Sequence, residues 1–184
     1  MRTVVICDVD GTLTDGTVWV NESGHESLRF HKRDGWLIQA DGTVWVNESG
    51  HESLRFHKRD GWLIQAAKDA GIDVALITDD PNTSPVECRA AKIGADYHPG
   101  IDKPELVRLH LEDGWRVVYV GDGTGGDMDA MELAHEVWMP CDAAGWDGHH
   151  RRTHARGGEG VLYEVLRHLL AQPRTGALAV PERS

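Results

Sequence analysis

The sequence predicts an α/β fold in which helices cover both faces of a central parallel sheet. Short apolar runs alternate along the chain with amphipathic helical patterns, and 184 residues suffice for one domain with a sizeable core. A third feature interrupts this alternation, because residues 15–40 and 41–66 have identical sequences. The repeat lies directly after the first expected strand.

The expected strands are short apolar runs, as strands that are buried on both faces usually are. They cover residues 4–7, 73–77, 95–97, 117–120 and 136–139. Amphipathic patterns between and after these strands predict helices at residues 86–93, 103–112, 127–134 and 161–170. A strand followed by a helix, several times over, is typical of a parallel sheet.

Each copy of the repeat carries the pattern of a β-hairpin. Thr-Val-Trp-Val is β-prone, Asn-Glu-Ser-Gly is typical of a turn, and Glu-Ser-Leu-Arg-Phe alternates. Two units do not make a solenoid, so the repeat indicates a tandem duplication. We expect a single domain at residues 1–171 that contains the duplicated segment 15–66, followed by a flexible tail at residues 172–184.

Composition and charge exclude several classes of function. The formal net charge of −11 repels phosphate backbones, so we expect no nucleic acid partner. No apolar run approaches the roughly 20 residues of a membrane span. The cysteines Cys7, Cys88 and Cys141 form neither a disulfide framework nor a CxxC pair. Without a signal-peptide pattern at the N-terminus, the expected location is the cytoplasm.

Acidic and phosphate-binding groups follow several of the expected strands. In a parallel sheet these strand ends meet at one edge, where ligands bind. The groups expected at this edge are Asp8, Asp10, Thr78, Lys103, Asp122 and Asp127. Clustered carboxylates repel one another unless a cation lies between them, and Mg²⁺ prefers oxygen ligands.

These residue types suit phosphoryl transfer. One carboxylate can attack phosphorus and form an aspartyl phosphate, while a second carboxyl protonates the leaving oxygen and then activates water. A hydroxyl and an ammonium can hold the phosphoryl oxygens as charge develops. The sequence therefore indicates a magnesium-dependent phosphatase.

The order of these groups resembles the four motifs of the haloacid dehalogenase superfamily. DVDGTLTDG stands at residues 8–16, then come Thr78 and Lys103, and GDGTGGD stands at residues 121–127. A response-regulator receiver uses similar residues but carries its phosphorylated aspartate on a central strand, whereas here the acidic pair follows the first strand. The hairpin, the RDG segment and the GxDK segment resemble the capless subclass typified by 3-deoxy-D-manno-octulosonate 8-phosphate phosphatase.

The resemblance implies a Rossmann-like three-layer sandwich, a Mg²⁺ cofactor, a small phosphorylated substrate and an assembly of four subunits. Asp8 would be the nucleophile and a metal ligand. Asp10 would be the general acid and base and would also bind the metal through its backbone carbonyl. Thr78 would bind a phosphoryl oxygen, Lys103 would neutralise charge, and Asp122 would be the acidic metal ligand.

Further roles follow from the same resemblance. Gly11 would let the phosphate approach the backbone, and Asp127 would orient the metal's waters or Lys103. Of the two Arg-Asp pairs in the repeat, we expect Arg59 with Asp60 to take the native position near the substrate, because the longer helix follows it. The hairpin would act as the lid, so the duplication should alter specificity more than chemistry.

The chain also departs from the resemblance. Asp79 and Asp80 follow Thr78 where the family often has Gly-Arg, and Gly123 replaces a second acid. Another substrate, such as phosphoserine or a phosphorylated sugar, therefore stays open beside a sugar-acid phosphate. A non-catalytic scaffold whose doubled hairpin mediates assembly is the runner-up. The loop at residues 149–156 is rich in His and Arg. Three interpretations of it stay open: a solvated loop, an anion contact and a zinc site.

Overall fold

The structure, a computed structural model, describes residues 2–9, 11–13, 28–31, 43–46, 52–54, 56–79, 84–124, 126–143 and 149–172. Its centre is a parallel sheet of six strands in the order β6-β5-β1-β7-β8-β9. The strands are β1 (Thr3–Asp8), β5 (Ile72–Ile77), β6 (Asp96–Tyr97), β7 (Arg116–Val120), β8 (Glu136–Met139) and β9 (Arg151–Arg152). This arrangement confirms the predicted Rossmann-like α/β fold.

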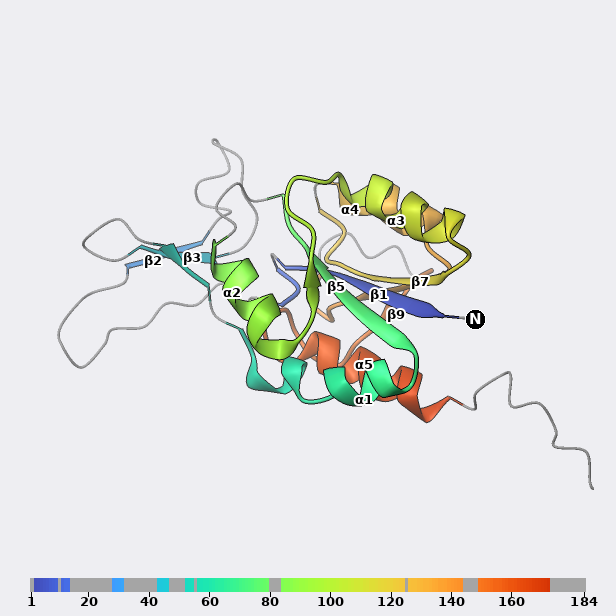
Figure 1. Cartoon of the computed structure of the whole chain (residues 1–184). Helices are drawn as coiled ribbons and strands as arrows, with labels where there is room; N and C mark the ends of the chain where they lie inside the picture. Colours follow the sequence, from blue (N-terminus) through green and yellow to red (C-terminus); the bar gives the residue numbers. More distant parts are fainter. Residues whose placement is uncertain are drawn as a thin grey trace, which may run out of the picture.

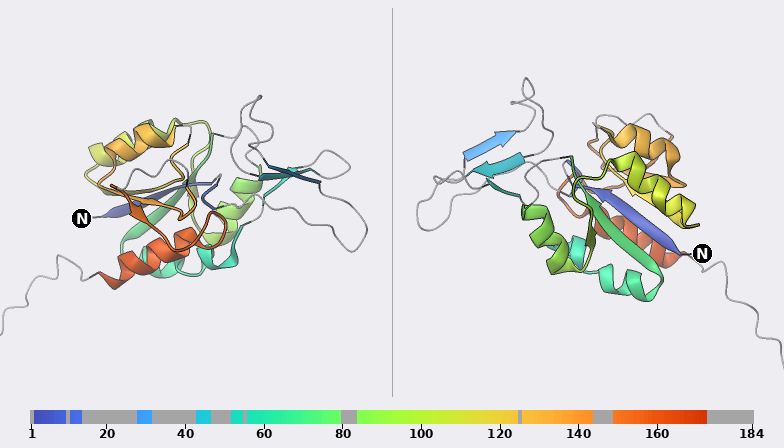
Figure 2. Two further views of the ribbon diagram at one scale, coloured as in Figure 1. Left: turned by 180° about the vertical axis from the view of Figure 1, so that it is seen from behind. Right: turned by 45° about the horizontal axis from the view of Figure 1, so that its top comes forward.

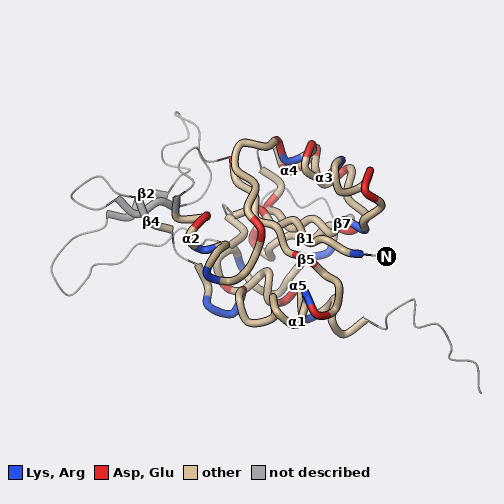
Figure 3. The backbone as a smooth tube through the Cα atoms, in the orientation of Figure 1, with Lys and Arg blue, Asp and Glu red and all other residues tan. Residues whose placement is uncertain are grey.

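Helices cover both faces of the sheet, as Figures 1 and 2 show. Helices α3 and α4 form one outer layer, and α1 and α5 lie on the opposite face. The helices are α1 (Ile64–Asp69), α2 (Ser84–Ile93), α3 (Lys103–Glu112), α4 (Asp127–Leu133) and α5 (Val161–Ala171). Charged residues of both signs lie along the layer of α3 and α4 in Figure 3, as expected for a helix layer with a solvent-facing side.

The core has two halves, one on each face of the sheet. On β1, Val5 and Cys7 pack with residues of α1, α2 and α5, whereas Val4 and Ile6 pack with residues of α3 and α4. Successive side chains of a strand point to opposite faces, so a strand covered on both sides must be apolar throughout. This explains why the central strands appear in the sequence as unbroken apolar runs.

Strand β1 lies at the point where the chain changes direction across the sheet. It pairs with β5 on one side and with β7 on the other. The chain first builds outward through β5 to β6, and then returns to add β7, β8 and β9. In open α/β sheets the crevice at such a switch point, outside the carboxyl ends of the strands, is where ligands bind.

A second sheet joins the two copies of the repeat. It consists of β2 (Leu28–His31), β3 (Thr43–Val46) and β4 (Glu52–Ser53), and it lies to one side of the main body in Figure 1. Within the second copy, β3 pairs with β4 as the predicted hairpin. On its other edge, β3 pairs antiparallel with β2 of the first copy, so that Leu28 stands opposite Val46.

Several details differ from the sequence-based expectation. Residues 151–152 form an edge strand where only a loop was considered, because a two-residue Arg-Arg segment carries no periodic signal. The longer helix expected after Arg59 and Asp60 is α1, which begins at Ile64 after a 3-10 turn at Lys58–Gly61. Asp10, Asp80 and the tail beyond residue 172 lie outside the described residues. Over the described part of the chain, no helix has the length and apolar character needed to cross a membrane.

Candidate active site

The predicted site residues meet at the carboxyl edge of the sheet. Asp8 is the last residue of β1, and Thr78 directly follows β5. Asp122 comes two residues after β7, while Lys103 and Asp127 are the first residues of α3 and α4. All five are buried. The parallel topology therefore brings together polar groups from across the sequence, as the motif order predicted.

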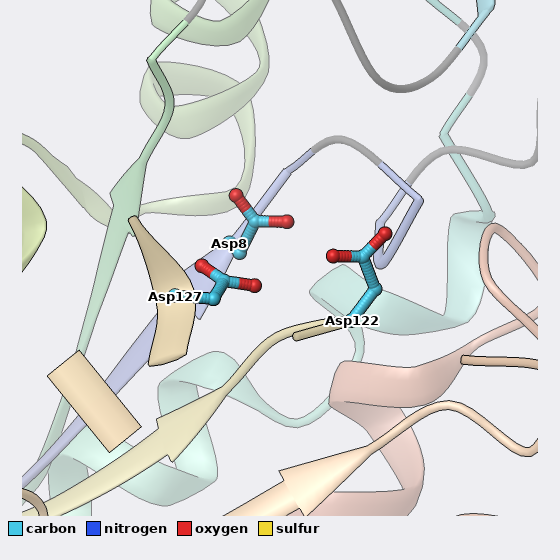
Figure 4. Close-up of side chains that lie close together, drawn as sticks. All are labelled: Asp8, Asp122 and Asp127. Carbon is cyan, nitrogen blue, oxygen red and sulfur yellow. The ribbon is translucent and has the colours of Figure 1, made fainter. Parts of the chain in front are cut away.

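Three carboxylates form the centre of the site. One oxygen from each of Asp8, Asp122 and Asp127 lies within 4.8 Å of the others, and Figure 4 shows the three side chains converging from separate elements. Three buried carboxylates this close repel one another strongly. Their hard oxygen donors fit a divalent cation such as Mg²⁺, which would offset that repulsion.

Lys103 supplies a positive charge to the same cluster. Its ammonium donates hydrogen bonds to Asp8 Oδ1 at 2.9 Å and to Asp127 Oδ1 at 3.0 Å, and it lies 3.0 Å from Asp79 Oδ2. Burial favours the neutral amine, but the charges of Asp8, Asp127 and Asp79 outweigh burial and raise the pKa of Lys103 well above its usual value. Lys103 is therefore held as a cation at any physiological pH.

Asp127 is held by groups from three elements. Besides Lys103, it accepts a hydrogen bond from the Tyr119 hydroxyl at 2.6 Å and one from the Gly123 backbone N–H at 3.2 Å. Burial and the neighbouring carboxylates raise the pKa of Tyr119 well above its ordinary value, so the hydroxyl stays a donor. Sequence reasoning missed Tyr119; a tyrosine in the otherwise aliphatic run Val117–Val120 was the available signal, because a buried hydroxyl needs a partner.

Asp122 is oriented by its own loop. The backbone N–H and the hydroxyl of Thr124 both donate to Asp122 Oδ1, at 2.9 and 2.7 Å. Two glycines make room for the acids: a Cβ at Gly11 would collide with the Asp122 carboxylate, and one at Gly121 would collide with Asp127. We expected Gly11 to make room for phosphate, and the structure adds that its open side faces Asp122.

Arg59 and Asp60 occupy the 3-10 turn before α1. Arg59 is exposed, with its guanidinium 5.9 Å from the centre of the Trp62 ring, and none of its contacts with described residues is to the acidic cluster. Asp60 is buried and its Oδ1 accepts the Tyr163 backbone N–H at 3.1 Å. The Arg-Asp pair of the first copy lies outside the described residues.

The loop around residues 149–156 is tied to the body by an ion pair and a hydrogen bond. Arg151 Nε lies 3.0 Å from Glu136 Oε1, and His154 Nδ1 lies 2.8 Å from Glu164 Oε1. Within the described ranges, the residues close enough to share a metal ion as a group of three or more are the aspartates of the site, so the histidines of this loop form no zinc cluster there. Cys7, which adjoins Asp8, is buried and its pKa is raised by burial and by nearby carboxylates, which makes it a poor nucleophile.

Comparison with solved structures indicates the class of enzyme. Among the structural neighbours are hydrolases of the haloacid dehalogenase superfamily, and several neighbours are named as phosphatases. The neighbours that are at least 25% identical and are named as phosphatases support a phosphatase. No protein-family model and no curated protein matches the sequence.

Three of the neighbours illustrate how similar the chain is to solved structures. A hypothetical protein from Xanthomonas campestris matches with a TM-score of 0.68 and 28% identity, over 92% of this chain and 82% of its own. The 3-deoxy-D-manno-octulosonate 8-phosphate phosphatase of Moraxella catarrhalis, solved with magnesium, phosphate and a KDO molecule, matches with a TM-score of 0.64 and 26% identity, over 92% and 86%. The cobalt-bound Haemophilus influenzae enzyme of that name matches with a TM-score of 0.61 and 25% identity, over 92% and 87%.

Proposed function

We propose that this chain is a Mg²⁺-dependent phosphomonoester hydrolase in which Asp8 is the nucleophile. The observation that carries the proposal is the buried group of Asp8, Asp122, Asp127 and Lys103 at the switch point of the sheet. Four ionisable side chains with three like charges are costly to bury together, and the fold alone gives no reason to keep them. A metal ion and a phosphoryl group would both be stabilised there.

The residues that would hold the ion are Asp8, Asp122 and the backbone carbonyl of Asp10, with Asp127 beside them. Bound there, Mg²⁺ would offset the charge of the carboxylates and polarise the phosphoryl oxygens. Asp127 and Tyr119 would keep Lys103 and the acids in place during the reaction, because their hydrogen bonds link β7, α3 and α4.

The proposed reaction has two steps at phosphorus. An Asp8 carboxylate oxygen attacks phosphorus, the ester P–O bond breaks, and the leaving oxygen takes the proton of Asp10. Asp10 then accepts a proton from water while the water oxygen attacks the aspartyl phosphate. The P–O bond to Asp8 breaks, which releases inorganic phosphate and restores the Asp8 carboxylate and the protonated Asp10. Lys103 and Thr78 would hold phosphoryl oxygens through both steps.

The proposed substrate is a small phosphorylated metabolite. The names of the neighbours from Moraxella catarrhalis and Haemophilus influenzae suggest a sugar-acid phosphate, and an ester with another leaving group stays open because Asp79 and Asp80 follow Thr78. The second sheet differs from a single hairpin lid, because β3 pairs with strands of both repeat copies. We propose that this doubled lid changes which leaving group is accepted and leaves the chemistry at Asp8 unchanged.

Release of inorganic phosphate from a panel of esters, measured with MgCl₂ and with EDTA, tests the proposed function. We expect turnover of at least one ester with MgCl₂, none with EDTA, and a loss of at least about a thousandfold for Asp8→Asn. Asp73→Asn is the matched control, because Asp73 lies near the start of β5 and pairs with Arg2 on the surface. Equal activity of the Asp8→Asn variant and the parent chain would contradict the proposal.

A further inference from the structure

Among the described residues, three acids lie beside Lys103, and Asp79 is the one that is open to solvent. Its side chain is 56% exposed, whereas those of Asp8 and Asp127, the other two acids beside Lys103, are 3% and 0% exposed. Asp79 stands second after β5, next to Thr78, at the edge where the site opens. Among the described residues, its ion pair with Lys103 is the polar contact that holds it at the site.

The ammonium of Lys103 is surrounded by acids. It donates two of its three hydrogens to Asp8 and Asp127, and Asp79 Oδ2 lies 3.0 Å from the same nitrogen. A phosphoryl oxygen that is to be held by Lys103 needs a place next to that nitrogen. Asp8 and Asp127 are buried, so breaking their pairing with Lys103 would leave unpaired charges away from water. Asp79 is exposed to solvent, so Asp79 is the group that gives way.

The charge of the site leads to the same conclusion. Among the described residues of the site, Asp8, Asp79, Asp122 and Asp127 bring four negative charges against the positive charge of Lys103. One divalent cation still leaves an excess of negative charge, and a phosphate dianion would increase it. An exposed carboxylate at the opening therefore opposes the entry of phosphate and of any acidic leaving group.

We propose that Asp79 determines specificity in the reaction proposed above, on which this inference rests. Its carboxylate holds the place beside Lys103 that a phosphoryl oxygen takes, and it turns outward toward the leaving group when substrate binds. In that position it favours a leaving group that carries an ammonium and disfavours one that carries a carboxylate. Asp79 does not touch the reacting atoms, so its removal should alter affinity and preference while kcat stays close to that of the parent chain.

Binding of inorganic phosphate in saturating MgCl₂, measured by titration calorimetry, tests the first part without requiring turnover. Asp79→Asn keeps the shape of the side chain and removes its charge, and we expect it to bind phosphate about threefold to tenfold more tightly than the parent chain. Asp73→Asn removes one charge from the same stretch of chain at the opposite end of β5, and its affinity should stay unchanged. An unchanged affinity for Asp79→Asn, or an equal gain in both variants, would overturn the proposal.

Two esters of similar size test the preference. Phosphoethanolamine carries an ammonium on its leaving group, and 2-phosphoglycolate carries a carboxylate. In Asp79→Asn the ratio of kcat/KM for the first ester to that for the second should fall by about tenfold, through KM rather than kcat. A ratio that stays the same would overturn the specificity role. If neither the parent chain nor the variant hydrolyses any ester, the proposed function fails, and phosphate binding still decides whether Asp79 competes at Lys103.

Discussion

Gly11 and Asp122 come into close contact at the site, although the sequence places them far apart. Gly11 has a φ of 75°, and a Cβ on it would overlap the carboxylate of Asp122. A side chain at this position would therefore push aside the acid that we propose as a metal ligand. The glycine is required for two separate reasons, the backbone conformation and the space beside it.

Gly11→Ala should weaken Mg²⁺ binding by at least about tenfold, since a displaced carboxylate ligand loses much of its contribution. Gly114→Ala is the matched control: Gly114 also has a φ of 75°, but an added Cβ would meet no atom within 4 Å. Both variants should lose roughly 1–2 kcal/mol of stability from backbone strain. Mg²⁺ titration followed by calorimetry separates the effects, and equal Mg²⁺ affinity in the two variants would contradict the assigned role.

Much of the site could be predicted at this scale from residue type and order. Asp8, Thr78 and Asp122 follow strands that are apolar enough to recognise, and Lys103 begins the helix after β6, so their meeting at one edge follows from parallel topology. A tyrosine in an aliphatic run signals a buried hydroxyl that needs a partner, but the bond of Tyr119 to Asp127 and the ion pair of Asp79 with Lys103 could not be predicted in this way. Each depends on a distance between side chains from different elements, which no local pattern encodes.

At the scale of elements, Asp60 connects the 3-10 turn at Lys58–Gly61 to the last helix. Helix α5 begins after Gly160, which has no side chain to cap it, and the carboxylate of Asp60 accepts the Tyr163 backbone N–H instead. Asp60 Oδ2 is buried without a hydrogen-bond partner in the described structure. Burial therefore raises the pKa of Asp60 to about 6, although Tyr163 and Arg89 act in the opposite direction.

This raised pKa predicts a pH-dependent stability. The carboxyl of Asp60 is protonated in the folded chain and ionised in the unfolded chain between about pH 4 and pH 6, so its contribution to stability is present at low pH and lost as pH rises. In Asp60→Asn this loss is absent. Relative to the parent chain, the variant should gain up to about 3 kcal/mol between pH 4 and pH 7.

Urea unfolding at several pH values checks this prediction. Asp69→Asn, a change on the exposed side of α1, is the control and should follow the parent chain. A difference between Asp60→Asn and the parent chain that does not vary from pH 4 to pH 7 would show that the carboxyl of Asp60 does not titrate in this range. The hydrogen bond from the Tyr163 backbone N–H to Asp60 also explains how the Arg-Asp-Gly segment of the second copy packs against α5.

Sequence reasoning could say least about how the strands of the repeat pair. Residues 26–31 of the first copy and 52–57 of the second have the same sequence, so both copies offer β3 the same segment. In the structure β3 pairs over four residues with β2 and over two with β4. Pattern and propensity are identical for both copies, and only the surrounding packing can distinguish them.

At the scale of the whole molecule, the catalytic body and the doubled lid should be separable. Removal of residues 15–40 and removal of residues 41–66 give the same single-copy chain, because the two copies are identical. That chain keeps Asp8, Lys103, Asp122 and Asp127. Written as the removal of residues 15–40, it lacks β2 and keeps the paired strands β3 and β4.

The single-copy chain should hydrolyse a small generic ester such as p-nitrophenyl phosphate with a kcat within about threefold of the parent value, because the chemistry lies in the body. Its relative kcat/KM for phosphorylated metabolites should change by about tenfold or more. Light scattering on both chains tests the scaffold alternative, in which the doubled hairpin mediates assembly. An unchanged substrate profile, with altered assembly alone, would favour that alternative.

The most direct test of the central claim is to trap the phosphoryl group on Asp8. The enzyme is mixed with substrate and MgCl₂, quenched in acid during turnover and reduced with borohydride, which converts an aspartyl phosphate to homoserine. Peptide mass spectrometry should then find homoserine at position 8 and aspartate at positions 122 and 127. Homoserine at another aspartate, or none at position 8 while phosphate is being released, would contradict the assignment of Asp8 as the nucleophile.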